Sequence, residues 1–339
     1  MSKALDKGFE QKKAEFQSLK DVENALSDFT KNGITEFVLH ERLQDKGRLV
    51  HFLNSVQKNC PELFLTVPVS VSVLDREIAE LCSNLFCTLD IQLAGTSKPT
   101  KDGTVYLFDK KKYAGKVSML NDMGLVFGFD MDWAVLQGDS IKLFRDRFDF
   151  ALSLYPNHID FFQLEDTEFS AKPTATFSSQ DLRYVRDLAF ACKTFYTCGR
   201  AVPWFLSVLT PLKIQPQKFF SDFAEWQRCN NCSFSSGFLP DLVKHAEIEK
   251  MQLNFLAEKY EEKHKESLFT VVKDVVRLNG AFARLAGEGE NSVVELSYNP
   301  DDLFSPEVMD IHGFAENVLL EPCQVKVFAG NQGPDYKVI

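Results

Sequence analysis

The chain has 339 residues, which corresponds to two domains at about 150 residues each, or to one large α/β domain with an appendage. Hydrophobic residues make up 45% and charged residues 25%, a balance that excludes a disordered, collagen-like or low-complexity chain. Lys and Arg number 38 against 48 Asp and Glu, so the net charge is −10. Because nucleic-acid binding needs a positive surface, we expect no nucleic-acid partner.

The N-terminal stretch MSKALDKGFEQKKAEF is charged and lacks the apolar core of a signal peptide. No stretch approaches the roughly 18 apolar residues of a membrane span. We therefore expect a soluble, cytoplasmic protein with no membrane partner. The 8 cysteines are sparse and irregularly spaced, which predicts reduced thiols rather than a disulfide scaffold.

In chain order, the first half alternates helical and strand patterns. Apolar positions three or four apart predict helices at residues 11–31, 45–59, 75–84, 109–123 and 140–155. Short apolar runs predict strands at residues 34–41, 63–69, 87–93, 125–133 and 158–165, and a polar loop is expected at 96–104. Strands separated by helices need crossover connections, which predict a parallel sheet covered by helices. An open doubly wound sheet and a partial barrel both fit, and about five strands favour an α/β partial TIM-like barrel over a closed one.

After Thr167 the pattern changes to nearly continuous helix up to about Ala286, preceded by a helix N-cap signal at Ser178. Two short strands are predicted in the tail, at residues 293–297 and 324–328. We therefore predict a partial (βα) barrel at 1–167 and a mostly helical C-terminal domain at 168–339.

Polar side chains concentrate at the carboxyl ends of the predicted strands, where ligands bind in parallel βα folds. The candidates are Glu41, Asp90, Gln92, Asp130, Asp132, Gln163 and Glu165. These acceptors suit a cation, an amine or a hydroxyl-rich ligand. The alternative is that they are solvated or hydrogen-bonded locally, although Asp90 and Asp130 lie inside apolar strands, where a carboxylate needs a partner.

Cys229 and Cys232 form the one closely spaced cysteine pair in the sequence. A metal site needs further ligands, and no second CxxC is present to supply them. The pair is a candidate metal site, and the alternative is that both are structural or surface thiols.

The stretch Met123–Trp133, the following Gly138-Asp139-Ser140, and the helix that ends in Leu152-Ser-Leu-Tyr-Pro156 resemble the fifth strand, loop and helix of the radical S-adenosylmethionine (radical SAM) superfamily. Cys87–Gly95 resembles its fourth strand, and the helical part after Ser178 is similar to the C-terminal region of its cobalamin-dependent type. The resemblance implies a (βα) barrel fold, with S-adenosylmethionine, cobalamin and an iron–sulfur cluster as the family's cofactors.

The chain departs from the family in lacking a CxxxCxxC motif, whose three thiolates hold the four-iron cluster. By the resemblance, Met1 falls just after that loop, so the first strand, the cluster loop and the cobalamin domain are expected to be absent. His40-Glu41-Arg42-Leu43 stands in place of the glycine-rich turn after the second strand. We therefore expect no cofactor bound by the isolated chain, with S-adenosylmethionine as the one compound that the resemblance still suggests.

Two functional interpretations follow. The chain is a non-catalytic relative that binds a small ligand or a partner protein, or it is a subunit or fragment of an enzyme whose cluster and cobalamin domain lie on another chain. A missing first strand would also leave the edge at Ile34–Glu41 uncovered. We expect residues 324–328 to cover that edge, with the N-terminal helix or a partner protein as alternatives.

Overall fold

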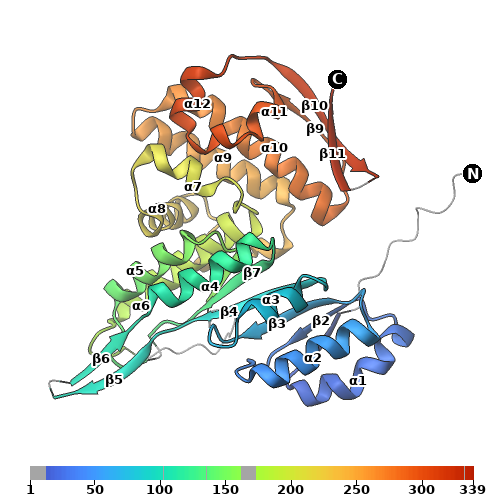
Figure 1. The fold of residues 1–339 in the computed structure, drawn as a ribbon. Coiled ribbons are helices and arrows are strands. Elements are labelled where there is room, and N and C mark those ends of the chain that lie inside the picture. Colours follow the sequence, from blue (N-terminus) through green and yellow to red (C-terminus); the bar gives the residue numbers. More distant parts are fainter. Residues whose placement is uncertain (1–12, 102, 135, 162–172, 332) are drawn as a thin grey trace, which may run out of the picture. The chain divides into compact units, whose positions relative to one another are not determined.

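The computed structural model describes residues 13–339 except 102, 135, 162–172 and 332. It divides into two compact units, Met1–Gly138 and Asp139–Ile339, which are described separately (Figure 1). The boundary predicted between residues 167 and 168 lies outside the described residues, so it stays a prediction. None of the described helices is long and apolar enough to cross a bilayer.

The first unit is built on a parallel sheet whose strand order follows the chain, β1-β2-β3-β4-β7. Its strands are β1 (Lys13–Phe16), β2 (Glu36–Leu39), β3 (Phe64–Val69), β4 (Cys87–Leu93) and β7 (Val126–Met131). The helices between them are α1 (Leu19–Asn32), α2 (Lys46–Asn59), α3 (Arg76–Cys82) and α4 (Lys110–Asp122). The predicted α/β class with a parallel sheet is confirmed.

Consecutive neighbouring strands joined by right-handed crossovers place all the helices on one face of the sheet. In agreement, α1 contacts α2, α2 contacts α3, and α3 contacts α4. The side chains on that face are fully buried, for example Leu65, Ile91 and Phe129. A sheet wound in one direction has no switch point, so the arrangement is that of a barrel segment rather than a doubly wound sheet.

The N-terminal prediction of one long helix is wrong. Residues Lys13–Phe16 form β1, which pairs in parallel with β2, and the helix starts only at Leu19. The edge of β2 is therefore covered by the chain's own first strand. Phe16 stabilises the pairing of β1, because its ring packs 5.5 Å from Phe29 and 6.0 Å from Phe37.

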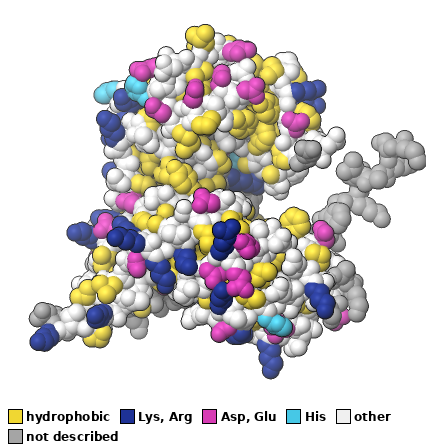
Figure 2. Space-filling model, viewed as in Figure 1, with side chains coloured by type: hydrophobic (Ala, Val, Ile, Leu, Met, Phe, Trp, Pro, Cys, Tyr) yellow, Lys and Arg dark blue, Asp and Glu magenta, His cyan; other side chains and the backbone are white. Residues whose placement is uncertain are grey.

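The polar segment predicted as a loop forms an antiparallel hairpin, β5 (Thr96–Thr100) and β6 (Gly103–Leu107). Its side chains are mostly exposed, which is why its strand character is weak in the sequence. Figure 2 shows positively charged side chains, which are lysines in this segment, beside apolar ones.

The second unit is mostly helical, as predicted. Its helices are α5 (Ile141–Leu152), α6 (Ser179–Cys192), α7 (Phe205–Leu209), α8 (Pro216–Cys229), α9 (His245–Glu262), α10 (Phe269–Glu288), α11 (Pro300–Leu303) and α12 (Ile311–Asn317), with strand β8 at His158–Phe161. The predicted cap at Ser178 is confirmed: its hydroxyl accepts from Asp181 N at 3.1 Å, and Asp181 accepts in return. A π-helical turn, η1 (Lys193–Cys198), continues α6.

Much of the phenylalanine content lies in the core of this helical unit. The Phe195 ring lies 5.0 Å from Phe219 and 5.1 Å from Phe223, and Phe255 packs on both of these partners. Most of these pairs meet edge to face, an arrangement that the aromatic quadrupole favours.

The C-terminal tail forms an antiparallel sheet of β9 (Ser292–Leu296), β10 (Cys323–Gly330) and β11 (Gly333–Val338). The strand predicted at 324–328 is therefore present, but it pairs with β9 and β11 and not with the edge of the parallel sheet. Val325 and Val327 are fully buried, and β10 contacts α10. The expectation that this segment covers the edge of β2 is wrong, because β11, which was not predicted, supplies its partner.

Candidate functional site

The candidate site is the face of the parallel sheet opposite helices α1–α4. Successive residues of a strand point to opposite faces, so the buried Leu89 and Ile91 of β4 alternate with Asp90 and Gln92. In the sheet register, Asp90 lies beside Gly128, and Gln92 lies beside Asp130. We call this surface the inner face.

Arg42 and Asp130 form an ion pair on the inner face, with side chains 19% and 22% exposed. Leu43 pairs with the end of β3, where its amide donates to Pro68 O at 2.9 Å. Arg42 therefore lies on the β2 side of β3, and its guanidinium reaches Asp130 of β7 across the inner face. Its Nη1 is buried and has no hydrogen-bond partner among the described residues.

Gln92 and Asp132 make the second contact at this end of the sheet, where Gln92 Nε2 donates to Asp132 Oδ2 at 2.9 Å. The end of β4 is held in place by Tyr113, whose hydroxyl donates to Gln92 O at 2.7 Å. The inner face thus presents a guanidinium, an amide and carboxylates from three strand ends. Such a set can bind a small ligand that carries an amine, hydroxyls or a carboxylate.

Glu41 lies apart from this set. Its carboxylate accepts from Leu19 N, the first residue of α1, at 2.7 Å, and from Arg48 Nη1 at 2.9 Å. The Leu19 amide and the Arg48 guanidinium hold the pKa of Glu41 below its usual value. Glu41 therefore stabilises the start of α1, as a carboxylate at a helix N-terminus does.

The structure brings together Gln92, Asp130 and Asp132, and places Asp90 on the same face. Gln163 and Glu165 lie outside the described residues. Arg42 was not among the predicted site residues, although it stands next to Glu41 in the short segment after β2. An arginine at this position has no distinguishing signal in the sequence, since only its ion pair with Asp130 of β7 shows where its side chain points.

Cys229 and Cys232, the candidate metal ligands, each contact a different neighbour in the structure. The Cys229 thiol contacts Glu225 Oε1 at 3.9 Å, whereas the Cys232 thiol donates to Gln227 O at 3.6 Å. No three His, Cys, Asp or Glu side chains of the described residues come together as metal ligands. Among the described residues no set of thiolates is placed to hold the iron–sulfur cluster that the resemblance implies, and the metal site at Cys229 and Cys232 stays a prediction.

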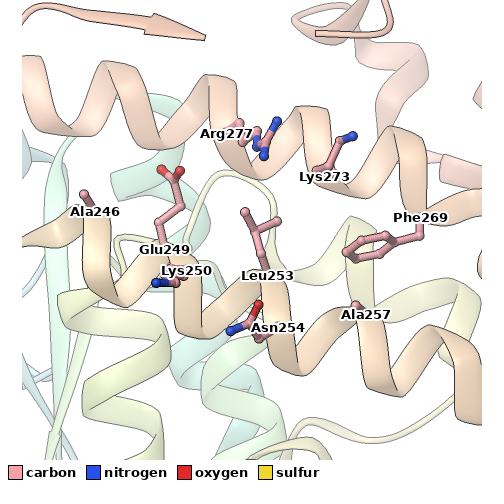
Figure 3. Close-up of a pocket in the computed structure, with 9 residues that line it drawn as sticks. All are labelled: Ala246, Glu249, Lys250, Leu253, Asn254, Ala257, Phe269, Lys273 and Arg277. Atoms are coloured by element: carbon pink, nitrogen blue, oxygen red, sulfur yellow. The ribbon is translucent and has the colours of Figure 1, made fainter. Parts of the chain in front are cut away.

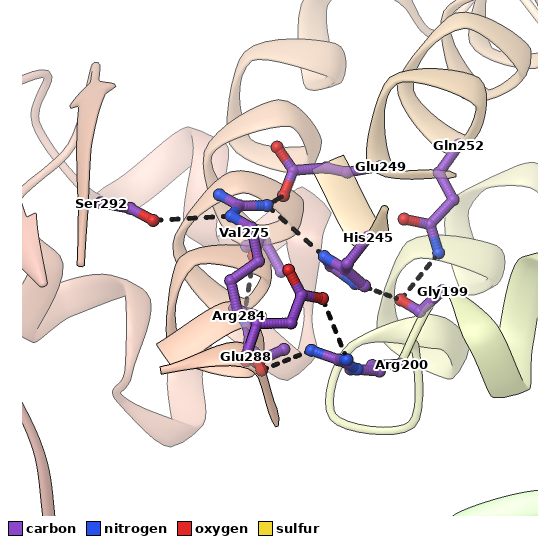
Figure 4. Close-up of polar contacts among 11 residues, drawn as sticks. Gly199, Arg200, His245, Glu249, Gln252, Val275, Arg284, Glu288 and Ser292 are labelled. Carbon is purple, nitrogen blue, oxygen red and sulfur yellow. Dashed lines mark hydrogen bonds and ion pairs between the residues drawn. The ribbon is translucent and has the colours of Figure 1, made fainter. Parts of the chain in front are cut away.

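A second polar cluster lies in the second unit around His245 at the start of α9 (Figure 4). The His245 Nε2 lies 3.2 Å from Gly199 O, and Nδ1 lies 3.4 Å from Arg284 Nη1. A carbonyl only accepts and a guanidinium only donates, so His245 is neutral with its proton on Nε2. Burial, with the charges of Arg200 and Arg284, lowers the pKa of His245 to about 4.

The remaining groups of this cluster bind one another. Arg284 pairs with Glu249 at 2.5 Å, and Arg200 pairs with Glu288 at 3.1 Å and donates to Ala283 O at 2.5 Å. A cavity of about 190 Å³ lies beside them. Because both His245 nitrogens are engaged and the ring is neutral near pH 7, the cluster joins α9, α10 and the turn after η1 as a structural network.

Solved structures match part of this chain, including two of one protein. Both are a radical S-adenosylmethionine methyltransferase, TsrM, from Kitasatospora setae, one with cobalamin and a [4Fe-4S] cluster and the other with tryptophan and an S-adenosylmethionine analogue. Each is 16% identical to this chain, with a TM-score of 0.32, and the match covers 42% of this chain and 30% of that chain.

No protein-family model matches the chain, and no curated protein matches it. A TM-score this low places no side chain, so the site rests on its own geometry.

Proposed function

We propose that this chain is a radical-SAM-like protein without its own iron–sulfur cluster, which binds a small polar ligand on the inner face and is not catalytic by itself. The observation that carries the proposal is the Arg42–Asp130 pair, which leaves a buried Arg42 Nη1 without a hydrogen-bond partner among the described residues. A buried donor without a partner is costly, and a ligand oxygen can satisfy it.

S-adenosylmethionine is the ligand to test first. Its amino acid part carries a carboxylate that suits Arg42 Nη1 and an ammonium group that suits the carboxylate of Asp132. These two recognition groups lie on the same face, at the carboxyl ends of parallel strands, where ligands bind in such folds.

A subunit role, with a partner chain supplying the first strand, has less support. β1 already pairs with β2, so the sheet needs no strand from a partner on that side. The split-enzyme alternative therefore rests on the resemblance alone.

The test is calorimetric titration of the full chain with S-adenosylmethionine, methionine and adenosine. For Asp132→Asn we expect S-adenosylmethionine binding to weaken about tenfold, which corresponds to roughly 1.4 kcal/mol. Glu80→Gln is the control, because Glu80 is an exposed acid on α3 that pairs with Arg76. Equal affinity in Asp132→Asn and Glu80→Gln, with unchanged melting temperatures, would show that the inner face is not the site. Absence of heat with all three compounds would reject this ligand class.

A further inference from the structure

The second unit carries a groove between α9 and α10, with a cavity of about 330 Å³ (Figure 3). Its apolar part is formed by Leu253 and Ala257 of α9 and Phe269 of α10. In Figure 3, Leu253 points from α9 towards α10, and the Phe269 ring extends into the space between the two helices. The volume is at the lower end of the range for small-ligand pockets, which is about 300–1,000 Å³.

Three cations, Lys250, Lys273 and Arg277, line the same groove. None of them makes an ion pair or hydrogen bond with another described residue, although the chain as a whole has a net charge of −10. Lys273 and Arg277 are four residues apart on α10 and therefore lie on the same side of that helix. The groove combines an apolar floor with positive charges that make no hydrogen bond or close ion pair with the described residues.

Glu249 is the one acidic residue that lines the groove, and its charge is already matched. Its carboxylate pairs at 2.5 Å with Arg284, which does not line the groove. Burial raises the pKa of Glu249, and the positive charges of Arg284 and Arg277 act against this rise. The residues that line the cavity therefore keep an excess of positive charge, which favours an anionic ligand.

We propose that this groove binds a small amphipathic anion, an aromatic or aliphatic body that carries a phosphate, sulfonate or carboxylate group. The apolar body would lie on Leu253 and Phe269, and the anionic group would contact Lys273 and Arg277. A docked protein helix fits less well, because a stable protein interface buries about 800 Å² on each partner and needs more apolar anchors than these. The site is independent of the inner face.

Three probes separate recognition of the apolar body from recognition of the anionic group. Anilinonaphthalene sulfonate has an apolar body and an anionic group. N-phenylnaphthylamine is apolar and uncharged, and inorganic pyrophosphate is charged and not apolar. Fluorescence titration of the full chain should give one site for the sulfonate. N-phenylnaphthylamine, titrated in the same way, and pyrophosphate, measured by displacement of the sulfonate, should each bind at least fivefold more weakly. Added salt should weaken the binding of the sulfonate and leave the binding of the uncharged amine unchanged.

The variant Lys273→Gln/Arg277→Gln should lower the affinity for anilinonaphthalene sulfonate at least fivefold. The matched control, Lys244→Gln/Lys263→Gln, removes the same charge from exposed positions of the same unit that do not line the groove. Circular dichroism and melting temperature establish that both variants are folded. Equal affinities in the two variants, no sulfonate binding, or equally tight binding of either single-feature probe would each overturn the proposal.

Discussion

At the scale of single residues, His245 shows how a neutral histidine is built into a charged cluster. Its two nitrogens face a carbonyl, Gly199 O, and a guanidinium, that of Arg284, so a second proton on Nδ1 would point at a positive charge. Burial and the two arginines lower its pKa from 6.5 to about 4. This arrangement stabilises the fold only while the ring is neutral.

His245 therefore predicts a loss of stability in acid. The unfolded chain binds its proton near pH 6.5 and the folded chain only near pH 4, so the contribution is fully present above 6.5 and is lost as pH falls towards 4. The free energy of unfolding lost over this pH range is of the order of 3 kcal/mol. Urea unfolding at several pH values should show a weaker dependence in this window for His245→Gln. An identical dependence in the variant would assign the acid sensitivity to other groups.

Gly199 is required for a different reason, which is close approach. A Cβ on Gly199 would lie 2.1 Å from Phe195 O and 2.1 Å from Gln252 Nε2, and Gln252 also donates to Gly199 O at 3.0 Å. We expect Gly199→Ala to lower the free energy of unfolding by about 1–3 kcal/mol, the usual cost of overpacking. Gly237→Ala is a contrasting variant, since no atom lies within 4 Å of its Cβ position and only its positive φ of 73° is strained. Thermal unfolding that ranks Gly199→Ala as the milder change would contradict this explanation.

At the scale of elements, β1 decides the state of the sheet edge. It has only four residues, yet it pairs along the whole of β2 and brings Phe16 against Phe29 and Phe37. Without β1, strand β2 with its buried Phe37 and Leu39 would become the edge, and an apolar edge with unpaired backbone groups favours association.

Removal of residues 1–17 should therefore cause dimerisation or aggregation, which size-exclusion chromatography with light scattering would detect. Removal of residues 1–10 is the matched control, because it leaves β1 intact. A monomeric 1–17 deletion with an unchanged melting temperature would mean that β1 does not protect the edge.

At the scale of the whole molecule, the distribution of cysteines bears on iron binding. Cys60, Cys82, Cys87 and Cys192 are buried, and no three candidate ligands meet among the residues that the structure describes. We predict that anaerobic reconstitution leaves no iron–sulfur cluster on the purified chain, as judged by iron content and visible absorbance. Retention of four iron atoms per chain, lost in Cys229→Ser, would reverse this prediction.

The sequence by itself determined most of the elements and their class. Apolar spacing located α2, α4 and β4 closely, and the Ser178 cap placed the start of α6, because these signals are local to the segment that they describe. It also located Gln92, Asp130 and Asp132 at strand ends, since parallel strands bring their carboxyl ends to the same edge of a sheet.

Only the tertiary structure decided what depends on pairing between distant segments. Lys13–Phe16 follows a helical pattern with α1 but becomes a strand because β2 offers it an edge. Cys323–Gly330 pairs with β9 and β11 instead of that edge, since a neighbouring antiparallel hairpin costs less chain entropy than a distant crossover. Arg42 contacts Asp130 on the inner face, whereas Glu41 binds the first amide of α1. Which side chains meet across strands depends on the curvature and register of the sheet and not on position in the chain.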